Sequence, residues 1–378
     1  MKNKYFKHPA LIALAVLSLA SCKKDKVGEE AIEPYTVPAT YNFAGVDYSS
    51  STNRIIMYNE MNTYLGTVTS AEVSNTVLLN YWNNTGNPFT TNTFLNSLGY
   101  NLAAKTADAA VITGYMAKVA SNSLSRTVPA VNGTAGFLTR VNGSKVIVGP
   151  EGMNYNQAVN KGTMGSLYFK QALDLLAAVP ADDNNNPKGA TPTAMQKHWD
   201  EAFGYLAVPK DYSPDLDYTV APLSALVFPA KPGAWGGYLA ERGKQINAGK
   251  TLFDAFLKGR AAIGAKDYKV RDEAIATIKT TWERLDAISA LAYVILPQKS
   301  DFIGKKGDQF GYISEGYGFI IGLKFRPSTS KLTEANYQKL VSIFTTNYYT
   351  LVDDPGLAKL KEAESILRTT YDLQNVTF

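Results

Sequence analysis

The chain has 378 residues, of which 45% are hydrophobic and 19% are charged. This composition is enough for a large hydrophobic core and excludes both a disordered chain and a coiled-coil rod. The formal charge of +5 falls to +2 without the three lysines of residues 1–21, so we expect no nucleic-acid partner. After residue 21 the one remaining histidine is His198, which excludes any site that needs two imidazoles from one chain.

The start of the chain has the pattern of a secretion signal. Residues 1–7 are basic, residues 10–20 are apolar, and Leu19-Ala20-Ser21-Cys22 follows. The apolar run is too short to span a bilayer. Its Leu-Ala-Ser-Cys ending resembles the lipobox of bacterial lipoproteins, which implies that Cys22 is lipidated and becomes the new N-terminus. The alternative is an ordinary signal peptide with an incidental cysteine.

The predicted anchor determines what we expect of location and cysteine chemistry. Cys22 is the only cysteine, so neither an internal disulfide nor thiol catalysis is possible. We expect residues 1–21 to be a lipoprotein signal peptide and residues 22–41, which are polar with two prolines, to be a flexible tether. The protein would then lie in the cell envelope, anchored to the outer membrane.

The remainder of the chain has the apolar spacing of helices. Apolar residues recur every three or four positions, which predicts about ten helices. They cover residues 55–65, 73–82, 107–119, 156–179, 194–206, 237–265, 270–296, 311–325, 334–349 and 357–371. Asn142-Gly143 between two β-rich runs predicts a small β-hairpin insertion near 137–148, with a type I′ turn. We expect an all-α protein of two packed helical bundles, residues 42–208 and 233–378, joined by a Pro-rich connection at 209–232.

The segment around His198 has the strongest chemical signal in the body of the chain. His198 and Glu201 are three residues apart, so on a helix both side chains project from one face. Helical bundles build metal sites from Glu and His at this spacing, and such a pair can also act as a general base or an ion pair. The alternative is a buried, hydrogen-bonded polar group that binds nothing. Two ligands are too few for a tight metal site, so further ligands would have to come from distant helices.

Six short motifs follow one another along the chain. They are Glu151-Gly152-Met153, Asn156-Gln157, Lys161-Gly162, His198-Trp199-Asp200-Glu201-Ala202, Gly259-Arg260-Ala261-Ala262 and Ser314-Glu315. In this order they resemble domain of unknown function 4856, an uncharacterised family of Bacteroidetes lipoproteins, from about Tyr41 to the C-terminus. More distantly, the His-x-x-Glu turn is similar to the G-x-H-x-x-E motif of imelysin-like proteins, although Gln196 replaces the glycine. That resemblance implies a two-bundle envelope protein linked to iron uptake, in a family historically classed as metallopeptidases.

The ionisable residues of these motifs are the candidate site. We expect Glu151, His198, Glu201, Arg260 and Glu315 to converge on one partly buried polar cluster. Arg260 lies among small residues, so its guanidinium could approach a neighbouring helix and hold one carboxylate bidentately. His198 and Glu201 would be metal ligands, with a divalent metal as the candidate cofactor.

Three functions remain open at this point. The first is a lipid-anchored binding protein of unknown ligand, with an imelysin-like role in iron or metal acquisition. The second is a metal-dependent hydrolase or peptidase of the envelope. The third is a glycan-binding surface lipoprotein, which the 23 tyrosines support. Catalytic zinc usually takes three protein ligands and favours His, so a chain with one His favours binding over catalysis. We expect the membrane, through Cys22, and an outer-membrane receptor as partners; the sequence contains no signal for an obligate oligomer.

Overall fold

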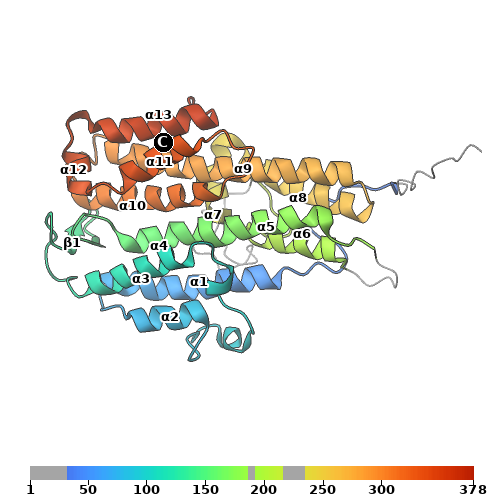
Figure 1. Ribbon diagram of the computed structural model, residues 1–378, viewed down its shortest axis with the longest axis horizontal. Coiled ribbons are helices and arrows are strands. Elements are labelled where there is room, and N and C mark those ends of the chain that lie inside the picture. The colour runs from blue at the N-terminus through green and yellow to red at the C-terminus, as the bar shows by residue number, and fades with distance from the viewer. Residues whose placement is uncertain (1–31, 186–191, 216–234) are drawn as a thin grey trace, which may run out of the picture.

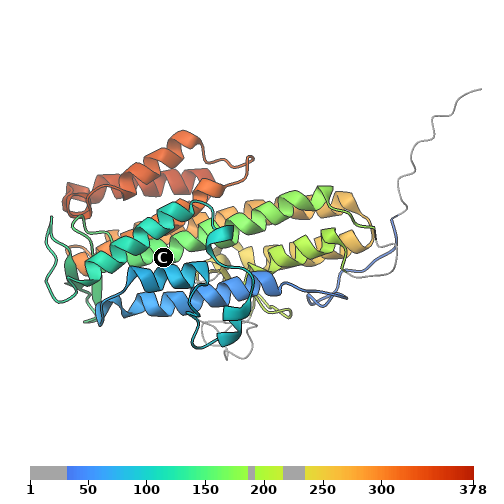
Figure 2. The ribbon, with the colours of Figure 1, turned by 60° about the horizontal axis from the view of Figure 1, so that its bottom comes forward.

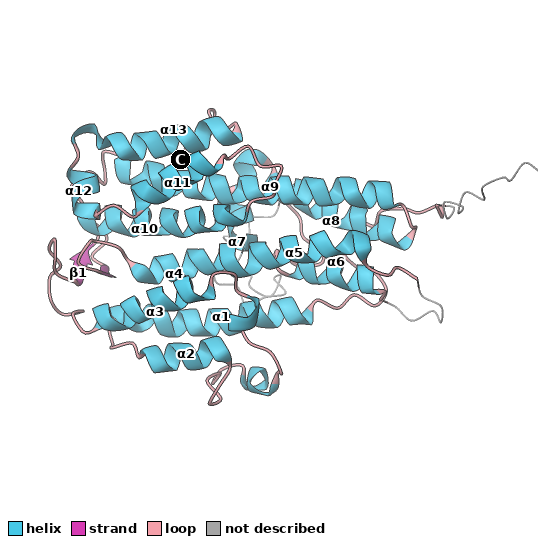
Figure 3. Cartoon of the chain, viewed as in Figure 1, coloured by secondary structure: helices cyan, strands magenta, loops and turns pink. Residues whose placement is uncertain are grey.

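Helices dominate the structure, a computed structural model that describes residues 32–185, 192–215 and 235–378. Across these residues, helices α1 to α13 accompany one two-stranded sheet. Most of the longer helices follow the long axis of an elongated molecule (Figure 1, Figure 3). The predicted all-α fold with a small β-hairpin is confirmed. None of the helices in the described ranges is both long and apolar enough to cross a membrane.

The first half of the chain contributes six helices. They are α1 (Ser49–Gly66), α2 (Asn75–Asn83), α3 (Ala109–Ser123), α4 (Tyr155–Thr163), α5 (Lys170–Ala178) and α6 (Ala194–Gly204). A π-helical segment, Met164–Phe169, joins α4 to α5, so residues 155–178 form one continuous helix, close to the prediction of 156–179. Helix α6 begins with a capping box, in which Thr193 Oγ1 accepts a hydrogen bond from the Gln196 amide.

The second half contributes seven helices. They are α7 (Trp235–Glu241), α8 (Ala248–Gly264), α9 (Tyr268–Ile295), α10 (Lys306–Gly322), α11 (Glu334–Phe344), α12 (Tyr348–Asp353) and α13 (Ala358–Tyr371). Two predicted helices are each divided. The helix predicted at 237–265 is interrupted because Asn247 has a φ of 54°, which an α-helix does not allow. The helix predicted at 334–349 is interrupted because Asn347 caps α12 by accepting a hydrogen bond from the Tyr349 amide.

The hairpin consists of β1 (Gly136–Thr139) and β2 (Lys145–Val148), paired antiparallel. The predicted type I′ turn is wrong, because that turn needs a positive φ at both central residues and only Gly143 of the pair has one, at 81°. The Gly143 amide donates to the Arg140 carbonyl at 3.0 Å, and the Arg140 amide donates to the Ser144 carbonyl at 2.8 Å. This pattern is a three-residue connection that ends in a left-handed glycine.

One hydrophobic core includes residues from both halves of the chain. Helix α4 packs against α10, α5 against α6, and α8 against α9. Glycines allow the closest approach: a Cβ added to Gly165 would lie 2.2 Å from the Cα of Gly322. The predicted division into two bundles stays a prediction, because residues 216–234 of the Pro-rich connection lie outside the described residues.

The residues before α1 are attached to the body of the protein. The Glu33 amide donates to the Ala265 carbonyl at 3.2 Å, and the Tyr35 hydroxyl donates to Asp267 Oδ2 at 3.0 Å. Residues 33–43, which we call the N-terminal strap, therefore reach α1 from the turn between α8 and α9 (Figure 2). The predicted tether at 22–41 is wrong for residues 33–41, which are bound. The predicted signal peptide and Cys22 lie outside the described residues.

Candidate functional site

The five predicted site residues do not form one cluster. His198 and Glu201 lie on α6 and Arg260 lies on α8, toward one end of the molecule, whereas Glu151 precedes α4 and Glu315 lies on α10 (Figure 1). The separation arises because α10 packs on α4 and α6 packs on α5. Helices α4 and α5 are opposite ends of the continuous helix 155–178, which is roughly 36 Å long at about 1.5 Å per residue. The expected convergence is therefore wrong.

His198 pairs with an aspartate that sequence reasoning missed. Its Nδ1 lies 2.7 Å from Asp182 Oδ2, and 38% of the histidine side chain is exposed. Glu201 is half-buried on the same helix. Across the described ranges, no group of three or more His, Cys, Asp or Glu residues could hold a metal ion. The further ligands that a tight site needs are therefore not found beside His198 and Glu201 in the described part of the chain.

Arg260 holds a carboxylate, as expected, and the carboxylate is that of Asp200. The predicted bidentate geometry is wrong, because Asp200 Oδ2 has no hydrogen-bond partner in the described residues. Arg260 Nε donates to Asp200 Oδ1 at 2.8 Å, and the Tyr41 hydroxyl donates to the same oxygen at 2.7 Å. Burial raises the pKa of Asp200, and the charge of Arg260 and both hydrogen bonds act in the opposite direction. The guanidinium also lies 5.1 Å from the centre of the Phe43 ring. This cluster attaches the N-terminal strap to α6 and α8.

Glu315 belongs to a second buried group. Its Oε2 lies 3.6 Å from Lys161 Nζ, and both side chains are almost fully buried between α10 and α4. The hydroxyls of Tyr238 and Tyr293 form a hydrogen bond of 3.0 Å nearby. Burial, and then the charge of Glu315, raise the pKa of both tyrosines. Loss of either residue would leave the other charge buried between these helices without its partner.

Glu151 lies near the β-hairpin end. Its backbone carbonyl accepts a hydrogen bond from the Tyr348 amide at 2.8 Å, which links it to α12. Burial and a hydrogen bond to the Glu151 side chain raise the pKa of Tyr155. A Cβ at Gly149 would lie 2.8 Å from Glu151 Oε1, so a larger residue there would displace the carboxylate.

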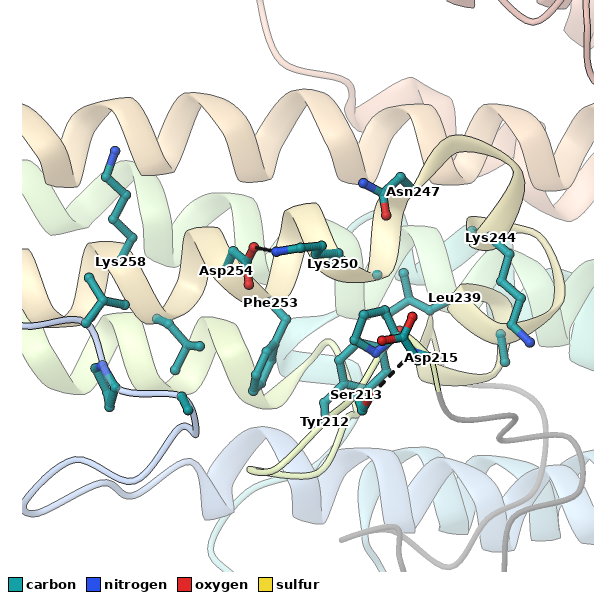
Figure 4. A pocket seen from close by; sticks show the side chains of 18 residues that line it. Tyr212, Ser213, Asp215, Leu239, Lys244, Asn247, Lys250, Phe253, Asp254 and Lys258 are labelled. Atoms are coloured by element: carbon teal, nitrogen blue, oxygen red, sulfur yellow. Dashed lines mark hydrogen bonds and ion pairs between the residues drawn. The ribbon is translucent and has the colours of Figure 1, made fainter.

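A cavity lined by both apolar and charged side chains lies beside α8 and was not predicted. We call this cavity of about 920 Å³ the α8 pocket. Its walls come from Val37, Pro38 and Ala39 of the strap, the loop 212–215, and residues 239–258 of α7, α8 and the turn between them. Figure 4 shows the side chains of Tyr212 and Phe253 near each other, with three lysine side chains spread along α8 and the turn before it. No local motif indicates the pocket, because its walls come from separate parts of the sequence.

The α8 pocket combines an aromatic wall with a charged rim. The rings of Tyr212 and Phe253 are 5.4 Å apart, centre to centre. Gly249 makes this possible, since a Cβ there would lie 2.1 Å from the Tyr212 hydroxyl oxygen. On the rim Lys250 pairs with Asp254. Pockets with apolar walls and a few polar groups are typical of sites for small organic ligands.

The described residues thus define an all-helical protein with a bound N-terminal strap and a pocket that the strap helps to form. Residues 38–369 match the family described as a domain of unknown function (DUF4856), and the chain belongs to this family, as its motifs predict. Neither the curated proteins nor the solved structures contain a match to this chain. The imelysin resemblance stays a prediction.

Proposed function

We propose that the protein is a lipid-anchored binding protein of the cell envelope that holds a glycan in the α8 pocket. The observation that carries this proposal is that the strap, which follows the predicted lipid anchor, forms one wall of the pocket. Val37 follows Cys22 by 15 residues. A fully extended chain covers about 3.3–3.6 Å per residue, so the pocket would open within about 50 Å of the lipid. Outer-membrane anchoring and a receptor partner belong to the same proposal.

The groups around the α8 pocket favour an organic ligand over a metal ion. An aromatic wall suits the apolar face of a sugar ring, and lysine, aspartate and asparagine side chains suit its hydroxyl groups. Both Lys250 and Asp254 can exchange their mutual ion pair for ligand hydroxyls at little cost, because more than half of each side chain is exposed. In the described residues, the imelysin-like pair His198 and Glu201 does not belong to a group of three or more possible metal ligands.

A blocking variant tests the glycan proposal. Ala39 is exposed on the strap and lines the pocket, so Ala39→Trp should obstruct part of it without disturbing the core. We expect calorimetric binding of envelope oligosaccharides by the chain without residues 1–22, and at least tenfold weaker binding by Ala39→Trp. Thr36→Trp, on the exposed strap but outside the pocket, is the matched control and should bind normally. Equal binding by both variants, or no oligosaccharide binding at all, contradicts the proposal.

Two further measurements address the anchor and the metal. Cys22→Ser should leave the membrane fraction and lose labelling by fatty-acid analogues. An unchanged membrane pool would contradict lipid anchoring but would not bear on ligand binding in the α8 pocket.

Elemental analysis of protein purified without chelators or a His tag should find no stoichiometric metal. A bound metal would favour the imelysin-like role instead.

A further inference from the structure

A second cavity lies between α5 and α9 and shares no lining residue with the α8 pocket. We call this cavity of about 550 Å³ the α5–α9 groove. Its floor is apolar, with Leu173, Leu176 and Ile275 buried and Phe325 partly buried after α10. Its volume is within the range of about 300–1,000 Å³ that is typical of small-molecule sites.

The charged side chains around the α5–α9 groove are paired, with one exception. Lys170 pairs with Asp174 at 2.5 Å, and Asp272 pairs with Arg271 at 2.8 Å. Lys279 is the exception: within the residues that the structure describes, its amine forms no hydrogen bond or ion pair.

Other side chains engage the carboxylate that lies nearest to Lys279 along α9. Glu283 follows one turn later on α9, but its Oε1 accepts hydrogen bonds from Ser330 and from the Tyr371 hydroxyl. Burial lowers the pKa of Lys279, and no opposite charge offsets that effect. The groove therefore presents one uncompensated, half-buried cation above an apolar floor.

We propose that the α5–α9 groove binds a small amphiphile with one carboxylate, of the medium-chain fatty-acid class. The carboxylate would pair with Lys279, because an anion there removes the cost of a desolvated amine. The alkyl chain would lie over Ile275 and against the partly buried ring of Phe325, so that the chain and this ring would both lose contact with water. A neutral amphiphile would gain only the contacts of its alkyl chain. Lys279 would repel an amphiphile with a cationic head group. This site is independent of the α8 pocket and of any glycan.

Titration with sodium decanoate, below its micellar concentration, tests the proposal. We expect saturable one-site binding by calorimetry, and at least tenfold weaker binding of 1-decanol. Lys279→Gln should weaken decanoate binding at least tenfold. Ala276→Trp should abolish it, because Ala276 is an exposed residue of α9 that lines the groove. Raising the pH enough to deprotonate Lys279 should weaken binding by the wild-type protein in the same way as Lys279→Gln.

Lys269→Gln is the matched control, since Lys269 is exposed on α9 outside the groove and its loss should change nothing. Circular dichroism establishes that each variant is folded. Absence of saturable decanoate binding overturns the proposal, as does equal binding by Lys279→Gln. Loss of decanoate binding in Ala39→Trp instead of Ala276→Trp would place the amphiphile in the α8 pocket and overturn this assignment while leaving the groove empty.

Discussion

Arg260 and Asp200 form an ion pair that is almost fully enclosed between α8 and α6, with 4% and 0% of their side chains exposed. Tyr41 completes the group from the N-terminal strap, and its ring stacks on Phe203 at a centroid distance of 3.7 Å. The attachment of the strap therefore depends on a charge pair that water does not reach.

Loss of Asp200 should be costly, because it leaves the Arg260 guanidinium buried without a partner. Asp200→Ala should lower the free energy of unfolding by about 3–5 kcal/mol. Asp174→Ala, which breaks the exposed pair with Lys170, should cost about 0–1 kcal/mol. Denaturant unfolding of both variants measures the difference. Similar losses in the two variants would contradict the enclosure of the pair.

Loss of the Tyr41 side chain should detach the strap while the body stays folded. Tyr41→Ala removes both the hydrogen bond to Asp200 and the stacking on Phe203. We expect faster amide hydrogen exchange in residues 33–43 and earlier proteolytic cleavage there. Tyr35→Phe removes only a part-buried hydrogen bond and should have a much smaller effect. Unchanged exchange in Tyr41→Ala would show that other contacts hold the strap.

Asp286 should make the protein less stable as the pH rises. Its carboxyl group is fully buried on α9, and neither oxygen has a hydrogen-bond partner in the described part of the chain. Burial, and then the charge of Glu283, raise its pKa well above the ordinary value of 3.8. The folded protein keeps this proton while the unfolded chain releases it near pH 4. The free energy of unfolding therefore falls as the pH rises from about 4 through the folded pKa.

Asp286→Asn removes this dependence, because the amide never ionises. We expect the variant to be more stable than wild type by about 1–3 kcal/mol at pH 7, and the gain to disappear near pH 4. Denaturant unfolding at pH 4, 5.5 and 7 measures both effects. Asp211→Asn, at an exposed position, should give no such pattern. A gain of the same size at every pH would mean that ionisation of Asp286 is not its cause.

The approach of the π-helical segment to α10 should tolerate no added side chain. A Cβ at Gly165 would lie 2.2 Å from Gly322 Cα, so Gly165→Ala should lower stability by about 1–3 kcal/mol as the helices separate. Gly114 on α3 has no atom within 4 Å of an added Cβ. Gly114→Ala should therefore raise stability by about 0.5–1 kcal/mol, through helix propensity alone. Thermal unfolding should place the two melting temperatures on opposite sides of wild type.

Apolar periodicity predicts most of the helices, because a helix with one buried face needs an apolar residue at every third or fourth position. Asn142-Gly143 predicts the hairpin, because few other residue pairs suit such a tight connection. The turn type was not predictable, since the Val141 amide donates to Asp308 Oδ2 from a distant helix and helps to fix the turn. The breaks at Asn247 and Asn347 were also missed. The apolar pattern continues across both, and single asparagines are weak signals of a helix end.

The candidate site was less predictable than the fold. Short motifs identify residues that the family shares but not which of them meet, because that depends on how α6 and α10 pack along the helix 155–178. One feature of the sequence does indicate the buried ion pair of Asp200. Asp200 lies between Trp199 and Phe203 on the apolar face of α6, which favours a buried aspartate with a cationic partner. His198 lies on the more exposed face, where an ion pair with Asp182 suffices.

The π-helical segment Met164–Phe169 also has a mechanical consequence. One extra residue in a helical turn rotates everything after it by about 100°, so a single rod presents one face to α10 and another to α6. Deleting one residue from the segment would keep the rod intact but turn the apolar side of α5 away from α6.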